Sequence, residues 1–137
     1  MADYLNNPIE EVFKIWGEAV EPLVGADNYS TDNVLTVADF PYARLLLMGL
    51  PTAVQDLEGN ECATAPSFQV ESFAKGNKSL SKVYAIDSAS HVAMVSMGFR
   101  RTYGPSLIAN ADSNIKRVVS RYTGFYAGDI HINNAAE

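Results

Sequence analysis

The side chains in this chain that are best suited to chemistry are two histidines and one cysteine. Cys62 lies in a predicted strand with no base near it in sequence, His91 lies within a predicted helix, and His131 lies in the C-terminal tail. A lone cysteine can form neither an intramolecular disulfide nor a multi-cysteine metal site. We therefore interpret Cys62 as a buried, inert thiol and His91 as a core or helix-surface histidine, and we predict no metal site.

The sequence also lacks the common phosphate-binding and nucleophile motifs. Glu58–Asn60 and Ala74–Asn77 each offer one glycine where a phosphate-binding loop needs several. No serine stands in a Gly-x-Ser-x-Gly elbow. We expect no catalytic residues and no cofactor. A small enzyme or ligand-binding domain with a site on the loop Ser106–Asn114 stays open as an alternative.

Basic residues gather in the last two predicted strands, and aromatic residues are interleaved with them. This arrangement is superficially similar to single-strand nucleic-acid binding surfaces. A net charge of −6 and a pI near 4.8 argue against stable DNA binding. We predict instead that the basic residues contact a neighbouring subunit. The basic set is Arg100, Arg101, Lys116, Arg117 and Arg121, and the aromatic set is Tyr103, Tyr122, Phe125 and Tyr126.

The alternation of a strand places two of these arginines together. Arg117 and Arg121 each lie two residues from Val119, so all three side chains share one face of the predicted strand. That face mixes charge with an apolar side chain, as an intersubunit surface would. We predict that Arg117 and Arg121 serve assembly rather than folding.

The charge is divided unevenly along the chain. Residues 1–65 hold two bases against eleven acids, a balance of −9, whereas residues 66–137 hold eight bases against five acids, a balance of +3. Two solvated faces would explain this division. A head-to-tail contact, in which the acidic surface of one subunit meets the basic strand of the next, would explain it equally well. Such a contact closes into a ring when the rotation permits.

Two amphipathic helices are predicted. The first runs from Pro8 to about Val24 behind an Asn7 cap, although Pro22 could end it near Val20. Trp16 is interpreted as a packing anchor. The second helix begins at a Ser79 cap and ends at Gly98. Its predicted buried stripe consists of Leu80, Val83, Tyr84, Ile86, Ala89, Val92, Ala93 and Met97.

Strands are predicted where β-branched and aromatic residues stand between turn-forming residues. They are Pro41–Met48, Thr52–Asp56, Cys62–Ala65, Phe68–Phe73, Phe99–Tyr103 and Ile115–Tyr126, with Val34–Val37 as a strand or packed loop segment. Leu57–Glu61 is predicted to turn, Pro66 to break the chain between two strands, and Gly25–Asn33 to be a loop. Neither face of Phe68–Phe73 is purely polar, so both are expected to be covered. The predicted class is α+β: a single domain with a mostly antiparallel sheet of about four strands, flanked by two helices.

Length and apolar runs set the outer bounds. At 137 residues the chain is expected to form one domain over residues 1–128, followed by a flexible tail over residues 129–137. The longest apolar run, Leu45–Leu50, is far shorter than the roughly 20 residues that span a bilayer. Met1–Tyr4 lacks the features of a signal peptide, so synthesis in a reducing cytoplasm is expected.

From about Phe40 to Gly128 the chain resembles the tail-terminator proteins of long-tailed bacteriophages, also described as tail-completion or minor capsid proteins. The family is held together by the order of its elements rather than by a catalytic signature. The segments that carry the resemblance are Phe40–Arg44, Asp56–Glu61, Ser67–Phe73, Tyr84–Asp87, Met97–Arg101 and Arg117–Tyr122.

The resemblance implies a structural virion protein of the tail or neck, assembled in the host cytoplasm. Such a protein forms a hexameric ring that caps the finished tail tube, stops its polymerisation and provides the interface for head joining. The implied partners are further copies of the chain, the tail tube protein and head–tail connector proteins. Genomic DNA would be met only as it passes through the channel, and no membrane is involved. Another phage neck or head–tail connector protein is the nearest alternative.

Overall fold

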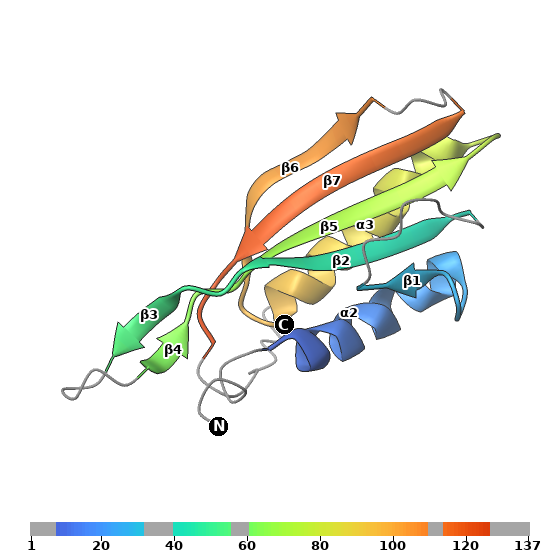
Figure 1. Ribbon diagram of the computed structural model, residues 1–137. Helices are drawn as coiled ribbons and strands as arrows, with labels where there is room; N and C mark the ends of the chain where they lie inside the picture. The colour runs from blue at the N-terminus through green and yellow to red at the C-terminus, as the bar shows by residue number, and fades with distance from the viewer. Residues whose placement is uncertain (1–7, 32–39, 56–60, 110–113, 127–137) are drawn as a thin grey trace.

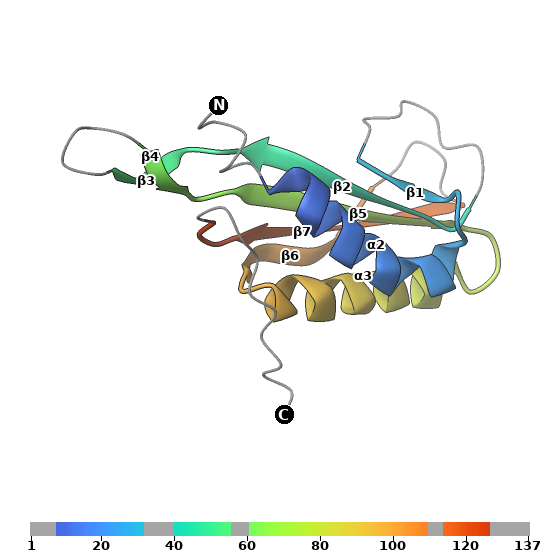
Figure 2. The same cartoon turned by 90° about the horizontal axis from the view of Figure 1, so that it is seen from below.

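The computed structural model of this protein describes residues 8–31, 40–55, 61–109 and 114–126. Five strands form one sheet, and both helices lie side by side against the same face of it (Figures 1 and 2). The predicted α+β class is confirmed. The elements in chain order are α2 (Ile9–Val24), β1 (Tyr29–Ser30), β2 (Tyr42–Gly49), β3 (Thr52–Gln55), β4 (Glu61–Thr64), β5 (Ser67–Lys75), α3 (Ser79–Ser96), β6 (Arg100–Ile108) and β7 (Ile115–Thr123).

The main sheet is mixed, with the strand order β1-β2-β5-β7-β6. Strand β1 pairs in parallel with β2, and the other neighbours are antiparallel, so the predicted four-stranded sheet was one strand short. The extra strand lies in Gly25–Asn33, which was predicted to be a loop. The ring of Tyr29 packs edge-on against Trp16, and the Ala43 amide donates to the Asn28 carbonyl at 3.0 Å. One aromatic anchor thus holds a polar segment against the edge of β2.

Strands β3 and β4 form a separate hairpin that projects beyond the end of the main sheet (Figure 1). Two backbone hydrogen bonds of 2.9 Å between Thr64 and Tyr126 tie its base to the segment after β7. The predicted strands here are confirmed to within a residue or two, and the chain leaves β4 at Pro66 as predicted. Residues 56–60, which hold most of the predicted turn, lie outside the described residues, as does Val34–Val37.

Helix α2 buries the stripe Val12, Trp16 and Val20 and continues to Val24. Pro22 does not end the helix early. It lies exposed in the last turn. Because proline has no N–H, the carbonyl of Glu18 has no helical donor there, and water can bond it instead. Trp16 is fully buried and its indole N–H donates to Ser90 Oγ at 2.9 Å, which confirms its role as a packing anchor. The predicted Asn7 cap lies outside the described residues.

Helix α3 is rotated relative to the predicted stripe. Four residues are buried as predicted: Val83, Ile86, Ala93 and Met97. By contrast, Leu80, Tyr84 and Val92 are exposed by 47%, 39% and 69%. The buried side of the helix carries polar residues, such as Ser90, that have hydrogen-bond partners inside the fold. A pattern of apolar positions cannot predict that these polar residues are buried. The buried residues of this helix that the stripe did not include are Ser79, Asp87, Ser90 and Met94.

The ends of α3 are set by the backbone. Ser79 is the first helical residue rather than the cap, and the cap position is Lys78, with a left-handed φ of 62°. Gly98 follows the helix with φ 93°, which confirms it as the stop.

Strand β6 is longer than predicted. It continues through Gly104 and Pro105 to Ile108, so part of the predicted loop Ser106–Asn114 is strand. The register against β7 shifts between Tyr103 and Ser106, and Gly104 takes φ 88° at this irregularity. A Cβ at Gly104 would approach the Val119 carbonyl oxygen more closely than real Cβ atoms do. Residues 110–113 of the predicted loop lie outside the described residues.

Strand β5 is buried on both of its faces, as its sequence predicted. Every residue from Phe68 to Ala74 is buried. Phe68 and Val70 belong to the hydrophobic core between sheet and helices. Gln69 and Glu71 alternate with them and therefore lie on the face that the helices do not cover.

Candidate interaction surface

The pairing of β2, β5 and β7 gathers polar side chains on the sheet face opposite the helices. Glu71 of β5 pairs with Arg44 of β2 on one side and with Val119 of β7 on the other. Gln69 pairs with Arg121 in the same way. Since paired residues of antiparallel strands share a face, these side chains meet across the three strands.

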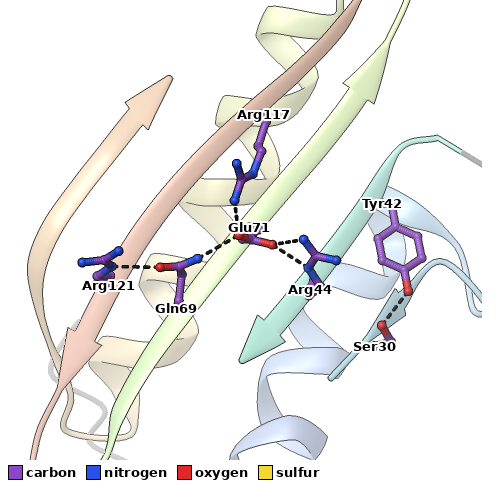
Figure 3. A network of polar contacts seen from close by, with 7 residues as sticks. All are labelled: Ser30, Tyr42, Arg44, Gln69, Glu71, Arg117 and Arg121. Carbon is purple, nitrogen blue, oxygen red and sulfur yellow. Dashed lines mark hydrogen bonds and ion pairs between the residues drawn. The ribbon is translucent and has the colours of Figure 1, made fainter. Parts of the chain in front are cut away.

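Glu71 is the centre of this network (Figure 3). Its Oε1 accepts from Nε of Arg44, which also forms an ion pair through Nη2, and its Oε2 accepts from Nη2 of Arg117. Gln69 Nε2 donates to Glu71 Oε2 at 2.7 Å, and Arg121 Nε donates to Gln69 Oε1 at 2.8 Å. We call these five residues the arginine face.

The charge on the arginine face is unbalanced. Glu71 is only 1% exposed, and burial by itself would raise the pKa of its carboxyl group. Hydrogen bonds from Arg117 and Arg44, together with their charges, more than offset burial, and the pKa of Glu71 lies below its usual value. Among the five residues of the arginine face, one carboxylate stands beside three guanidinium groups. The side chain of Arg121 is exposed and contacts no carboxylate among the described residues.

The aromatic rings on this face are already covered by arginines. The guanidinium carbons of Arg44 and Arg117 lie 5.2 Å and 5.9 Å from the ring centroid of Phe73, which is itself buried. Arg121 lies 5.1 Å from the ring centroid of Tyr103. The buried ring of Phe73 is therefore closed to a nucleic-acid base, and the ring of Tyr103, which is 43% exposed, is partly covered by Arg121.

A second polar cluster lies on the helix side of the sheet. Ser120 Oγ donates to Asp87 Oδ1 at 2.6 Å, and Arg101 Nη2 lies 3.2 Å from Asp87 Oδ2. Arg101 Nη2 also donates to the Tyr122 hydroxyl at 3.3 Å, and His91 Nδ1 lies 3.2 Å from that hydroxyl. The cluster joins α3 to β6 and β7 beneath the sheet.

Beside the ion pair of Asp87 with Arg101, the surroundings favour the neutral forms of His91 and Tyr122. Burial, followed by the nearby charge of Arg101, lowers the pKa of His91. Burial raises the pKa of Tyr122 although Arg101 opposes the shift. Ser120 donates to a carboxylate and is fully buried, so it is not arranged as an activated nucleophile. We interpret the cluster as a packing contact between helix and sheet.

The five basic residues predicted as interface candidates divide between the two faces. Arg117 and Arg121 share the open face with Val119, as predicted. Arg101 turns toward the helices and pairs with Asp87. The register also places Lys116 on the helix side, whereas Arg100 is exposed at the start of β6. Arg117 pairs with the buried Glu71 of its own chain and therefore contributes to the fold as well. The roles of the five basic residues in subunit contact stay predictions.

Three members of the arginine face were not identified from the sequence: Arg44, Gln69 and Glu71. The only local signal was the polar alternation of Gln69 and Glu71 in an otherwise apolar strand. Which residues face them depends on the pairing of strands far apart in the chain. The predicted aromatic set is divided too, since Tyr122 and Tyr126 are buried while Phe125 is 76% exposed.

The histidine and cysteine positions do not form a site in the part of the chain that the structure covers. His91 is half-buried on α3, Cys62 lies in β4, and His131 lies outside the described residues. Among residues 8–31, 40–55, 61–109 and 114–126, no group of three or more histidine, cysteine or acidic residues could hold a metal ion.

Comparison of the chain with protein-family models and with curated protein sequences returned no match. Neither described helix has both the length and the apolar character required to cross a membrane.

Proposed function

We propose that this protein is a non-catalytic assembly subunit of a bacteriophage tail. It forms a ring-shaped oligomer that caps the tail tube, stops its polymerisation and provides the interface for head joining. The observation that carries the proposal is the arginine face, on the side of the sheet that no described helix covers. There the exposed Arg121 and the half-buried Arg117 present positive charge, and hydrogen bonds to Gln69 and Glu71 hold them in place. An assembly protein needs such a surface for a protein partner, whereas an enzyme would need reactive groups that converge on a substrate.

The resemblance to tail terminators supports the same proposal. A cap on a tube has to present different faces to the tube below and to the head above. Two unlike faces are also what head-to-tail contacts between the copies of a ring require. This protein has them, with a layer of two helices on one side of the sheet and the arginine face on the other (Figures 2 and 3). The projecting hairpin of β3 and β4 gives it a third element that can reach a neighbour.

Deletion of the gene from its phage, followed by electron microscopy of lysates, tests the proposal. We expect headless tails of uncontrolled length, and we expect uniform tails joined to heads when the protein is supplied in trans. Normal tails attached to heads in the deletion would contradict the proposal. Filled heads without any tails would also contradict it and would point to a connector on the head side.

A further inference from the structure

The outer side of helix α2 is acidic. Glu10, Glu18 and Glu21 are exposed, and their spacing at 3.6 residues per turn places them on one side of the helix, with Lys14 as the one base among them. Neither Glu10 nor Glu18 forms an ion pair with another described residue. We call the three glutamates the acidic surface. The buried stripe of α2 faces the sheet, so the acidic surface points away from it.

The acidic surface and the arginine face therefore lie on opposite sides of the subunit. Helix α2 packs on one face of the sheet, and the arginine face is on the other (Figures 2 and 3). The guanidinium group of Arg121 is exposed and forms no ion pair with a carboxylate of another described residue. Beside it, Tyr103 is 43% exposed and adds apolar area that a docked partner would bury.

We propose that copies of this protein join head to tail, with the acidic surface of one copy docked on the arginine face of the next. This inference rests on the proposed function, because it names the two surfaces through which the subunits of a ring would meet. The partner that binds the arginine face is a second copy, because the chain carries its own complementary negative charge, the acidic surface, on the opposite side of the fold. A contact between two different surfaces is heterologous, and its repetition closes a ring when the rotation between copies permits.

Nucleic acid is the competing occupant of a positively charged sheet face. Two features favour protein instead. The ring of Phe73 is buried, and the exposed ring of Tyr103 already has Arg121 packed against it, so a base would find only one partly covered ring on which to stack. The net charge of −6 also repels a polyanion as a whole, whereas an acidic helix presents only a few carboxylates.

Two single charge reversals and their mixture test the proposal. Arg121→Glu places a negative charge opposite Glu18, and Glu18→Arg places a positive charge opposite Arg121. Each reversal alone should weaken self-association by roughly tenfold or more, because like charges face each other in every contact. Lys82→Glu is the matched control. Lys82 is exposed on α3 and belongs to neither surface, so the control should associate like the unmodified protein.

The equimolar mixture of the two variants gives the sharpest result. In an alternating assembly, the glutamate introduced into one variant meets the arginine introduced into the other, and the next contact joins unaltered Arg121 to unaltered Glu18. The mixture should therefore recover the oligomer that neither variant forms alone, as followed by sedimentation velocity. A fold lost in one variant could not be recovered in this way, and far-UV circular dichroism of each variant checks the fold independently.

Other outcomes would overturn the inference without deciding the proposed function. If the unmodified protein forms a ring that both reversals leave intact, the subunits join through other surfaces. If the reversals weaken the ring but the mixture does not recover it, the two surfaces do not meet. If Arg121→Glu instead abolishes binding of a single-stranded or duplex DNA oligonucleotide and leaves the oligomer unchanged, the arginine face binds nucleic acid. The deletion phenotype in the phage is read separately from all three.

Discussion

At the scale of single residues, Glu71 determines whether three arginines can share one sheet face. It is almost completely buried and accepts hydrogen bonds from Arg44, Arg117 and Gln69. A buried charge that loses its partner is strongly destabilising, because the remaining charge is left in a poorly solvated place. The network is therefore a requirement of the fold as well as a surface.

Glu71→Gln should lower the free energy of unfolding by about 3 kcal/mol, since the buried guanidinium of Arg44 and the half-buried one of Arg117 would lose their counter-charge. Urea unfolding of the variant and of the unmodified protein measures the difference. Asp27→Asn is the matched control, because Asp27 is exposed and belongs to neither proposed docking surface, so the change should alter stability by no more than about 0.5 kcal/mol. Equal effects of the two changes would show that the Glu71 network does not stabilise the subunit.

The same carboxylate predicts how stability depends on pH. Because the pKa of Glu71 is lower in the folded state than its ordinary value of 4.5, its contribution is fully present above pH 4.5. The contribution is lost as the pH falls from 4.5 through the lower folded-state pKa. The stability difference between the unmodified protein and Glu71→Gln should therefore shrink on acidification below pH 4.5. A difference that stays constant at all pH values would contradict the lowered pKa.

The sequence located only part of the arginine face. Alternation along one strand was enough to place Arg117 and Arg121 with Val119, because that relation is local. It could not show that Arg44 and Glu71 lie across from one another, since their side chains meet only after β2 has paired with β5. Strand pairing is set by the whole chain, so polar networks across strands are harder to predict than faces of single strands.

At the scale of elements, helix α3 shows where apolar periodicity fails as a guide. Its stripe was placed by apolar positions, yet Leu80, Tyr84 and Val92 are exposed. Asp87 and Ser90 occupy the buried side because each finds a partner, Ser120 in β7 and Trp16 in α2. A polar group with its hydrogen bonds satisfied can be buried at little cost.

The extent of β6 was missed for a related reason. Gly104 and Pro105 are turn-forming residues by composition, but here they continue a strand through an irregularity in its register. Short β1 was missed because the side chain that holds it, Tyr29, stands alone in a polar segment. The long strands β2, β5 and β7 and both helix spans were predicted because their own residues determine them.

Gly104→Ala should destabilise the β6–β7 pair more than an ordinary glycine substitution. An alanine here would have to keep φ 88°, which residues other than glycine rarely adopt, and its Cβ would collide with the Val119 carbonyl oxygen. Gly76→Ala is the matched control, because Gly76 has φ 81° but open space around its Cβ position. The control should cost about 1 kcal/mol from backbone strain alone, and Gly104→Ala should cost clearly more. Thermal unfolding of both variants measures this, and equal losses would contradict the close approach.

At the scale of the whole molecule, the subunit is polarised across its thickness. Helix α2, whose exposed side is acidic, lies on one side of the sheet (Figure 2), and the arginine face lies on the other (Figure 3). Head-to-tail repetition of such a unit gives either a closed ring or an open filament, and the angle between the two surfaces decides which. A tail cap needs the closed form.

Self-association through these surfaces should weaken as salt is raised. Added salt screens exposed charges, and the Debye length falls to about 3 Å at about 1 M. The oligomer should therefore dissociate more readily at about 1 M than at low ionic strength, as followed by sedimentation velocity. The ion pairs of the buried Glu71 are screened less by salt than exposed charges are. The fold should therefore persist at high salt, and the far-UV circular dichroism spectrum should not change. An oligomer that tightens in high salt would indicate an apolar interface instead.

The most direct test of the central claim is native mass spectrometry of the unmodified protein at high micromolar concentration, alone and with isolated tail tubes. The account predicts one dominant closed species, a hexamer, either free or recovered from the tube ends. A strict monomer under both conditions would contradict assembly into a ring.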